Sequence, residues 1–190
     1  MRFIFIAPWY SDYYPVLPAS LLNQTHQNWK LLMIHDGPVH KPENIPAIKD
    51  DRISVITTEA RSNDYGHTLR ATASENLKWL ISHELGDVVV HTNADNYYLP
   101  HFCERMAPPS WKKATYCDML HSHWRWAHKV ADLNIAKIDC GCVVADRELA
   151  IKAGWPTRRW EADWDWIQAM IDIESRDAFL HIEETLFIHN

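Results

Sequence analysis

In Val88-Val89-Val90-His91-Thr92-Asn93-Ala94-Asp95-Asn96, an apolar β-branched run passes directly into a carboxylate flanked by two carboxamides. The valines are typical of a strand buried within a parallel sheet. Asp95 would then follow the carboxyl end of that strand, where open α/β sheets bind their ligands. Carboxylate oxygens suit a hard divalent cation that also contacts phosphate, so Asp95 is a candidate metal ligand. On an extended segment Asn93 points the same way and would add a hydrogen bond.

A second apolar strand ends in a similar way, in Leu31-Leu32-Met33-Ile34-His35-Asp36-Gly37. Glycine directly after Asp36 favours a tight turn beside a ligand. The carboxylate would accept hydrogen bonds from a nucleotide base or a ribose, and the alternative role is a turn cap. Two strands that end in acids indicate one nucleotide site.

The order of the remaining elements predicts an α/β fold. Strands are expected at 3–7, 31–35, 53–57, 88–90, 116–121, 138–144 and 178–188, and helices at 14–27, 67–82, 100–106, 147–153 and 163–173. Strand and helix alternate through the first 100 residues, which predicts βαβ units and a mostly parallel sheet. The second half is less regular. We expect one α/β domain whose first half binds a nucleotide.

Composition narrows the classes of function. The 190 residues carry a formal net charge of −6, which argues against a nucleic-acid partner, since such proteins normally present a basic face. No stretch approaches the roughly 20 apolar residues of a membrane span. The four cysteines lack the paired spacing of a structural zinc site. A reducing cytoplasm is therefore the expected location.

The polar segment Arg61-Ser62-Asn63-Asp64-Tyr65-Gly66-His67-Thr68-Leu69-Arg70 leads into a predicted helix. The free N–H groups of a helix start favour phosphate. Arg70, in the first turns, would add a bidentate contact to a diphosphate. The alternative is a solvated loop followed by a surface arginine.

Three acids alternate with aromatic residues at another helix start, in Trp160-Glu161-Ala162-Asp163-Trp164-Asp165-Trp166. Helix N-termini favour carboxylates, so capping is the alternative role for at least two of them. The functional interpretation is a general base, because a carboxylate beside aromatic walls has a tunable pKa and accepts a proton from an acceptor hydroxyl.

Taken together and in this order, the segments resemble the family 2 glycosyltransferases of the GT-A fold. The resemblance covers nearly the whole chain and rests on residues 19–30 (first helix and its exit), 33–38 (Asp-Asp-Gly-Ser signature), 63–70 (Asn-x-Gly segment), 93–96 (metal-binding Asp-x-Asp), 139–155 (acceptor-side strand, turn and helix) and 162–165 (Glu-Asp motif). It implies a single Rossmann-like GT-A domain over residues 1–190. Residues 1–100 would bind the nucleotide and residues 101–190 would form the acceptor side.

The resemblance also implies an activity and the residues that perform it. It implies a hexosyltransferase-like enzyme that uses a nucleotide-sugar, usually a UDP-sugar, with Mn²⁺ or Mg²⁺, and transfers the sugar to an acceptor hydroxyl with inversion. The implied donor-binding residues are Pro8, Trp9 and Tyr10 around the base, Asp36 at the uracil, Asn63 and Arg70 near the base or diphosphate, and Asn93 with Asp95. Asp95 would hold the metal, and His189 would add a late metal or phosphate contact. Asp163 would deprotonate the acceptor.

Three departures from the family pattern keep alternatives open. His35 replaces the first Asp of the signature, and Asn93 replaces the first Asp of the metal motif. Ala162 replaces the Glu of the Glu-Asp pair, which leaves Asp163, Asp165 or Glu161 as the base. A nucleotide-sugar-binding or nucleotide-sugar-hydrolysing protein that has lost transfer is the second hypothesis. A nucleotidyltransferase is disfavoured, because residues 8–12 do not form a glycine-rich basic loop after the first strand.

Overall fold

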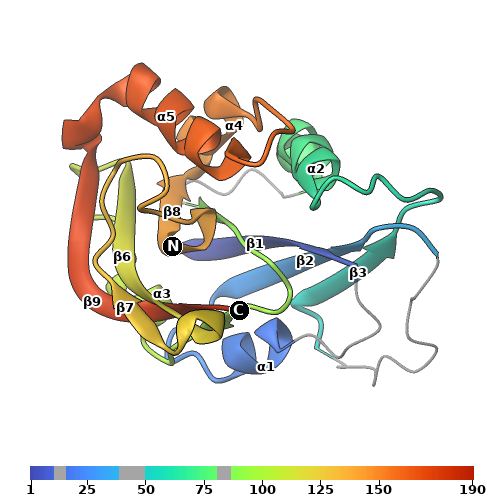
Figure 1. The fold of residues 1–190 in the computed structure, drawn as a ribbon, viewed down its shortest axis with the longest axis horizontal. Coiled ribbons are helices and arrows are strands. Elements are labelled where there is room, and N and C mark those ends of the chain that lie inside the picture. The colour runs from blue at the N-terminus through green and yellow to red at the C-terminus, as the bar shows by residue number, and fades with distance from the viewer. Residues whose placement is uncertain (11–15, 39–49, 81–86) are drawn as a thin grey trace.

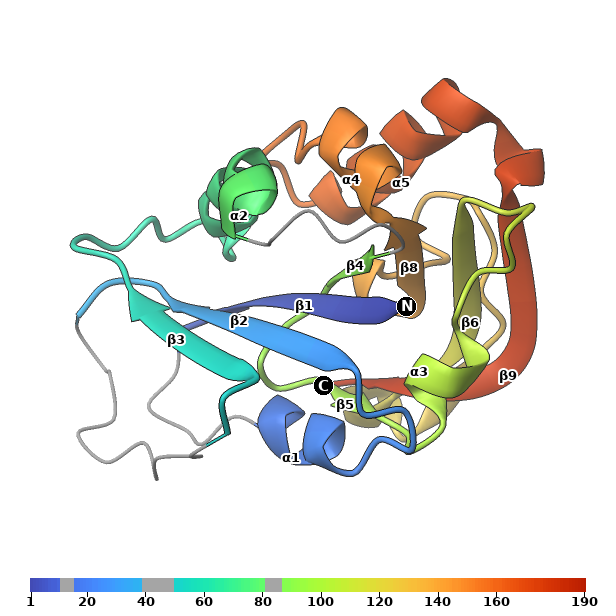
Figure 2. The same ribbon diagram turned by 180° about the vertical axis from the view of Figure 1, so that it is seen from behind.

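One curved sheet runs through the molecule and carries helices on both faces (Figures 1 and 2). The computed structural model describes residues 1–10, 16–38, 50–80 and 87–190. Within these ranges the strands are β1 (Arg2–Trp9), β2 (Trp29–His35), β3 (Ile53–Thr57), β4 (Asp87–His91), β5 (Tyr97–Tyr98), β6 (Ala114–His121), β7 (Ala127–Lys129), β8 (Val143–Asp146) and β9 (Phe179–His189). The helices are α1 (Leu17–Leu22), α2 (His67–Leu80), α3 (Phe102–Arg105), α4 (Arg147–Ala153) and α5 (Ala162–Glu174), with 3₁₀ turns η1 (Ser122–Trp124), η2 (Cys140–Cys142) and η3 (Arg176–Ala178).

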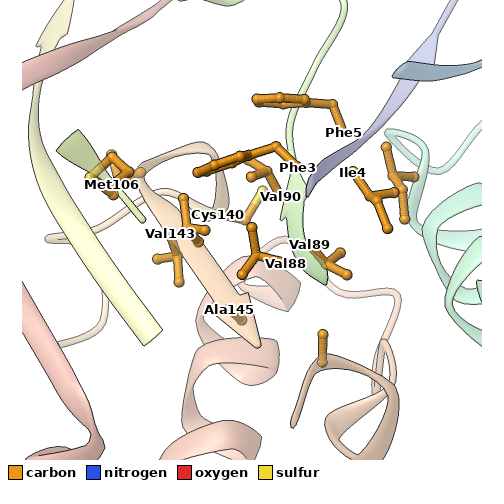
Figure 3. Close-up of a cluster of buried hydrophobic side chains, with 14 of the residues drawn as sticks. Phe3, Ile4, Phe5, Val88, Val89, Val90, Met106, Cys140, Val143 and Ala145 are labelled. Atoms are coloured by element: carbon orange, nitrogen blue, oxygen red, sulfur yellow. The ribbon is translucent and has the colours of Figure 1, made fainter. Parts of the chain in front are cut away.

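The first half forms the parallel part of the sheet. β1 pairs in parallel with β2 and β4, and β2 pairs in parallel with β3. Every residue of β1 and β4 is buried, as expected for central strands covered on both faces. Figure 3 shows Phe3, Phe5 and Val88–Val90 packed near Val143 of β8, where the two halves of the sheet join.

The second half continues the same sheet with mixed directions. The strand order is β3-β2-β1-β4-β8-β6-β9-β5, and β7 pairs with β6. β8 is antiparallel to both β4 and β6, whereas β9 is parallel to β6. β6 and β9 therefore point the same way as β4. Their carboxyl ends reach the sheet edge at which β4 ends and β8 begins.

Several predicted elements differ from the observed ones in extent. The first helix is confined to α1, because Asn23 caps it and the Gln24 side chain donates to the Leu99 carbonyl at 2.8 Å. The strand predicted at 138–144 begins only at Val143, because the Asp139 carboxylate accepts the Gly141 N–H at 2.7 Å and caps η2. The strand at 53–57 and the helix at 147–153 match their predictions. The end of the helix predicted at 67–82 and positions 14–15 of the first helix lie outside the described residues.

The helices form two layers. Figures 1 and 2 show α2, α4 and α5 together over one face of the sheet and α1 on the other. In the described part of the chain, none of the helices combines the length and the apolar character needed to cross a bilayer.

Candidate functional site

Strand direction explains why the candidate residues collect at one edge of the sheet. The loops after β1, β2 and β4 leave that edge, and these loops carry Tyr10, Asp36 and Asp95. β6 and β9 end there at His121 and His189, which are paired in the β6–β9 register. η2 and the start of α5 contact each other beside this edge. Residues far apart in sequence are therefore brought to one side of the molecule.

Asp36 holds the loop that follows β3. It is buried, and its two carboxylate oxygens accept the backbone N–H groups of Ser62 at 2.7 Å and Asn63 at 3.1 Å. The Arg61 guanidinium lies 4.0 Å from the carboxylate. Because each oxygen has two lone pairs, the group keeps capacity for another donor. Asn63 itself is exposed, in a left-handed conformation with φ +54°.

The His35 side chain stabilises the turn after β2. The ring is buried, and its Nδ1 lies 2.6 Å from the Gly37 carbonyl oxygen. A carbonyl only accepts, so Nδ1 carries the proton and donates. The residue that departs from the family signature thus stabilises the tight turn that follows Asp36.

Pro8 and Trp9 end β1 and Tyr10 follows it, and the three side chains lie in different environments. Trp9 is 5% exposed and meets the His35 ring edge to face, so it belongs to the core. Pro8 is also buried, against Gly66, where an added Cβ would lie 2.4 Å from the Pro8 Cβ. Tyr10 is exposed, and the Arg61 guanidinium lies 3.5 Å over its ring. Tyr10 is therefore the member of this trio that is accessible to a planar ligand.

Arg70 is a buried cation rather than a surface residue. It is 2% exposed. Its guanidinium donates to the carbonyls of Tyr65 at 3.1 Å and Thr92 at 2.9 Å, and to the Asn93 side-chain oxygen. Its positive charge also lowers the pKa of Asp95 and of Asp139, although other effects on those two groups are larger. Arg70 therefore ties the start of α2 to the loop after β4 and places a buried positive charge at this edge.

Asp95 is exposed at the end of the β4 loop. Partial exclusion of water raises its pKa, and the nearby His123 and Arg70 oppose that effect. The Asp95 carbonyl accepts a hydrogen bond from the Asn190 side chain, while the Asn190 backbone N–H donates to Asn96 at 3.2 Å. The residues that follow β9 are thereby held against the Asn93–Asn96 loop.

Two carboxylates, Asp139 and Asp163, face each other beside η2. Their oxygens lie within 4.8 Å of one another, and the Cys140 N–H donates to Asp163 at 3.4 Å. Burial first, and then the negative charge of Asp163, raise the pKa of Asp139 from 3.8 to about 7, against the opposing effects of the Gly141 N–H and Arg70. Like charges in one buried site favour sharing a proton. The pair is therefore suited to accepting and releasing a proton near neutral pH.

Asp165 makes different contacts from Asp163, two residues away. It accepts hydrogen bonds from the Thr157 hydroxyl at 2.5 Å and from Arg159 Nε at 2.7 Å. These bonds, Arg159 first, lower the pKa of Asp165. The third acid, Glu161, is exposed and lies 4.0 Å from Arg159. Both acids interact with Arg159, whereas Asp163 points towards η2.

Three histidines form the other cluster of titratable groups at this edge. One ring nitrogen from each of His121, His123 and His189 lies within 4.8 Å of the others. Burial and the two neighbouring imidazoles lower the pKa of His189 to about 4, so this ring is neutral at physiological pH. His189 Nε2 lies 3.6 Å from Asp139 Oδ2. The histidine cluster and the carboxylate pair are therefore adjacent.

The chemistry of the potential metal ligands determines which metal ions could bind at this edge of the sheet. In the described part of the chain, two groups of potential ligands lie within 4.8 Å of one another, namely the three histidines and Asp139–Cys140–Asp163. Asp95 belongs to neither group, and Asn93 is already bonded to Arg70. Imidazole nitrogens suit later divalent transition ions, whereas Mg²⁺ prefers oxygen ligands. The residues present therefore fit a divalent transition ion held with nitrogen participation.

Sequence reasoning did not select Asp139, His121 or His123. Asp139 precedes Cys140-Gly141-Cys142 and resembles an ordinary strand residue, and the two histidines stand in a His-x-His pair without a further motif. The spacing of that pair was the available signal, because alternate residues of an extended segment share a face. Only strand pairing with β9 brings His189 to them.

Comparisons with known proteins agree on the fold. Neither a protein-family model nor a curated protein sequence matches the chain. Among solved structures, the crystal structure of S. aureus TarS superposes with a TM-score of 0.69 at 12% identity, covering 100% of this chain and 37% of that one. A TarS fragment in complex with UDP-GlcNAc gives 0.64 at 12% identity, covering 100% of this chain and 58% of the fragment.

A different protein gives the same result. Glucosyl-3-phosphoglycerate synthase from Mycobacterium tuberculosis, crystallised with Mn²⁺, UDP and glucosyl-3-phosphoglycerate, gives a TM-score of 0.58 at 12% identity. That match covers 100% of this chain and 72% of the synthase. The chain spans between 37% and 60% of the length of the TarS chains that it matches. The predicted GT-A glycosyltransferase fold, with its mixed and curved α/β sheet, is confirmed.

Proposed function

We propose that this chain is the catalytic domain of a nucleotide-sugar-dependent glycosyltransferase that uses a UDP-sugar. The observation that carries the proposal is the Asp139–Asp163 pair, which lies beside His189 at the end of β9. Solved structures with this fold were crystallised with UDP or UDP-GlcNAc. A general base at this edge is what transfer to a hydroxyl requires.

In this proposal Asp163 takes the proton of the acceptor hydroxyl. Asp139 assists, because the proton that the two carboxylates share can move to Asp139 when Asp163 must be an anion. Attack from the side opposite the leaving diphosphate inverts the anomeric centre. Asp165, the other acid expected from the sequence, interacts with Arg159 and Thr157. These contacts support a role in fixing the start of α5.

The donor would lie across the first half of the edge. Tyr10 would stack on the base, Asp36 would accept from the base N–H, and Asn63 would lie beside it. Pro8 and Trp9 would shape this wall from beneath. Arg70 would contribute positive potential towards the diphosphate while it holds Asn93 in place. A divalent metal, Mn²⁺ or Mg²⁺ in the family, would neutralise charge on the leaving diphosphate when bound near Asp95 and His189.

The test uses a panel of nucleotide-sugars with and without Mn²⁺. We expect at least one UDP-sugar to raise the melting temperature and to release UDP slowly in the presence of hydroxyl acceptors. Asp163→Asn should keep donor affinity and lose roughly 10²-fold or more of turnover, as removal of a general base does. The absence of stabilisation by every UDP-sugar would refute the donor site, and full turnover by Asp163→Asn would refute the base.

A second function is favoured by one specific contact. Asn93, at the first position of the metal motif, accepts a hydrogen bond from Arg70 and is a neutral amide. A site with less anionic charge would hold a metal–diphosphate more weakly. The alternative is a protein that binds or hydrolyses nucleotide-sugars without transfer. UDP release at the same rate with and without any acceptor supports this alternative over transfer.

A further inference from the structure

The histidine cluster (His121, His123 and His189) is built by three different elements. His121 is the last residue of β6, His123 lies in η1 directly after it, and His189 is the last residue of β9. The parallel β6–β9 ladder pairs His121 with His189. Because rigid strand ends carry two of the rings, their relative position is set by the sheet rather than by a loop.

The distances within the cluster suit a shared metal ion. His189 Nδ1 lies 3.0 Å from His121 Nδ1, and the three ligand atoms are within 4.8 Å of one another. Two nitrogens bound at 2.0–2.1 Å to one tetrahedral ion are about 3.3 Å apart. The rings therefore need only small shifts to share an ion.

The surroundings orient the His189 ring as metal-binding histidines are usually oriented. The second nitrogen of His189, Nε2, faces the Asp139 carboxylate at 3.6 Å, while Nδ1 faces the cluster. A carboxylate on the far ring nitrogen is the common partner of a ligating histidine. On the other side, the Trp124 ring stacks on His121 with centroids 4.9 Å apart.

We propose that His121, His123 and His189 bind one divalent transition ion through three imidazole nitrogens and leave coordination positions open for oxygen ligands. Three imidazoles favour Zn²⁺, Co²⁺ or Ni²⁺ over Mg²⁺. Binding itself rests on these side chains alone. The role of the ion deepens the proposed function, on which it rests: Asn190, the residue after His189, bonds to the Asp95 carbonyl, and an ion held beside that loop would accept a diphosphate oxygen.

The test measures metal binding by the chelator-treated full chain without nucleotide. Co²⁺ is the probe, since its visible absorption reports nitrogen coordination, and Zn²⁺ and Mg²⁺ are added as competitors. We expect one Co²⁺ per chain, displaced by Zn²⁺ at equal concentration and retained at a roughly hundredfold excess of Mg²⁺. His121→Ala and His123→Ala should each weaken Co²⁺ binding about tenfold or more.

Two control variants test whether a change in Co²⁺ affinity comes from the histidine cluster rather than from loss of the fold. His128→Ala removes an exposed histidine of the neighbouring β7 that lies outside the cluster, and it should leave Co²⁺ affinity unchanged. His123→Gln replaces an exposed side chain, so its fold should survive, as an unchanged melting temperature without metal would confirm. Wild-type Co²⁺ affinity in His123→Gln, or displacement of Co²⁺ by equimolar Mg²⁺, would overturn the proposal.

Nucleotide-sugar binding is measured separately, with Mn²⁺ or Co²⁺ present. A cobalt spectrum that persists while no UDP-sugar binds would leave the metal site intact and refute the donor site. UDP-sugar binding without a cobalt signal would refute the three-histidine site and leave the donor site standing. The two proposals therefore fail in different measurements.

Discussion

The two halves of the sheet edge that carries the candidate site use their charged groups in opposite ways. In the β1–β4 half, Asp36 accepts two backbone N–H groups, and Arg70 donates to two backbone carbonyls and an amide. In the β6–β9 half, Asp139 faces Asp163, and His189 faces two other imidazoles. In the first arrangement the hydrogen-bond partners of each charge are backbone groups or an amide, whereas the second sets like groups against one another.

The charged groups of the first half support loops, whereas those of the second half are suited to proton and metal chemistry. Charges bonded to backbone groups fix the loops that would hold a ligand. Crowded titratable groups instead acquire shifted pKa values, as Asp139 and His189 do. Such shifts are typical of functional sites. We therefore expect substitutions in the first half to change stability and substitutions in the second half to change proton and metal chemistry.

The largest effect on stability is expected from Arg70→Met. The substitution leaves the Thr92 carbonyl and the Asn93 side-chain oxygen without this donor, and each unsatisfied acceptor costs about 1–3 kcal/mol. Urea unfolding measures the loss. Lys30→Met, which removes an exposed cation from β2, should change stability by less than about 0.5 kcal/mol. Equal losses in the two variants would contradict the supporting role of Arg70.

Gly66→Ala should cost about 2–3 kcal/mol. The residue has φ +81°, and the new Cβ would meet the Pro8 ring at 2.4 Å. Gly154→Ala is the matched control, because its φ is +62° but nothing lies within 4 Å of an added Cβ. Gly154→Ala therefore measures only the cost of placing alanine at a positive φ. If chemical denaturation gives Gly66→Ala the smaller loss, the contact with Pro8 does not restrict this loop.

Asp139→Asn should stabilise the protein at pH 8 by about 1–2 kcal/mol and have little effect at pH 4. The pKa of Asp139 is about 7 in the folded chain, against an ordinary value of 3.8. A raised carboxyl pKa means that stability falls as the pH rises from about 4 to about 7 and is constant above that. The neutral amide removes this penalty, which is fully present at pH 8.

The measurement for Asp139→Asn is the melting temperature, which should rise by several degrees at pH 8. Asp172→Asn, an exposed acid of α5 bonded to Gln168, is the control and should show no gain that depends on pH. A lower melting temperature of Asp139→Asn at pH 8 would show that the ionised pair is stabilising, which contradicts the comparison.

The smallest effect is expected from Asp165→Asn, below about 1 kcal/mol, because its partner Arg159 is 59% exposed. The pKa of Asp165 is lowered in the folded chain. Its contribution is therefore present above the ordinary carboxyl pKa and is lost as the pH falls through the lowered value. Urea unfolding at pH 7 and in acid tests this, and a difference that grows in acid would contradict the ion pair.

Much of the fold was predictable from local sequence. The strand at 53–57 and the helix at 147–153 match the prediction, since period-2 and helical patterns specify an element through its neighbours. The positions of Asp36 and Asp95 after apolar strands were predicted for the same reason. The burial of Trp9 and Arg70 was not, because burial depends on what the rest of the chain places above a residue.

The sequence by itself therefore determined the elements, their order and the family-like spacing of the acids. Only the tertiary structure decided which titratable groups meet. His121 and His189 become neighbours through parallel pairing of β6 and β9, and Asp139 meets Asp163 because η2 packs on α5. Such contacts join residues that are distant in sequence. Their register depends on the packing of the whole sheet, which no local pattern encodes.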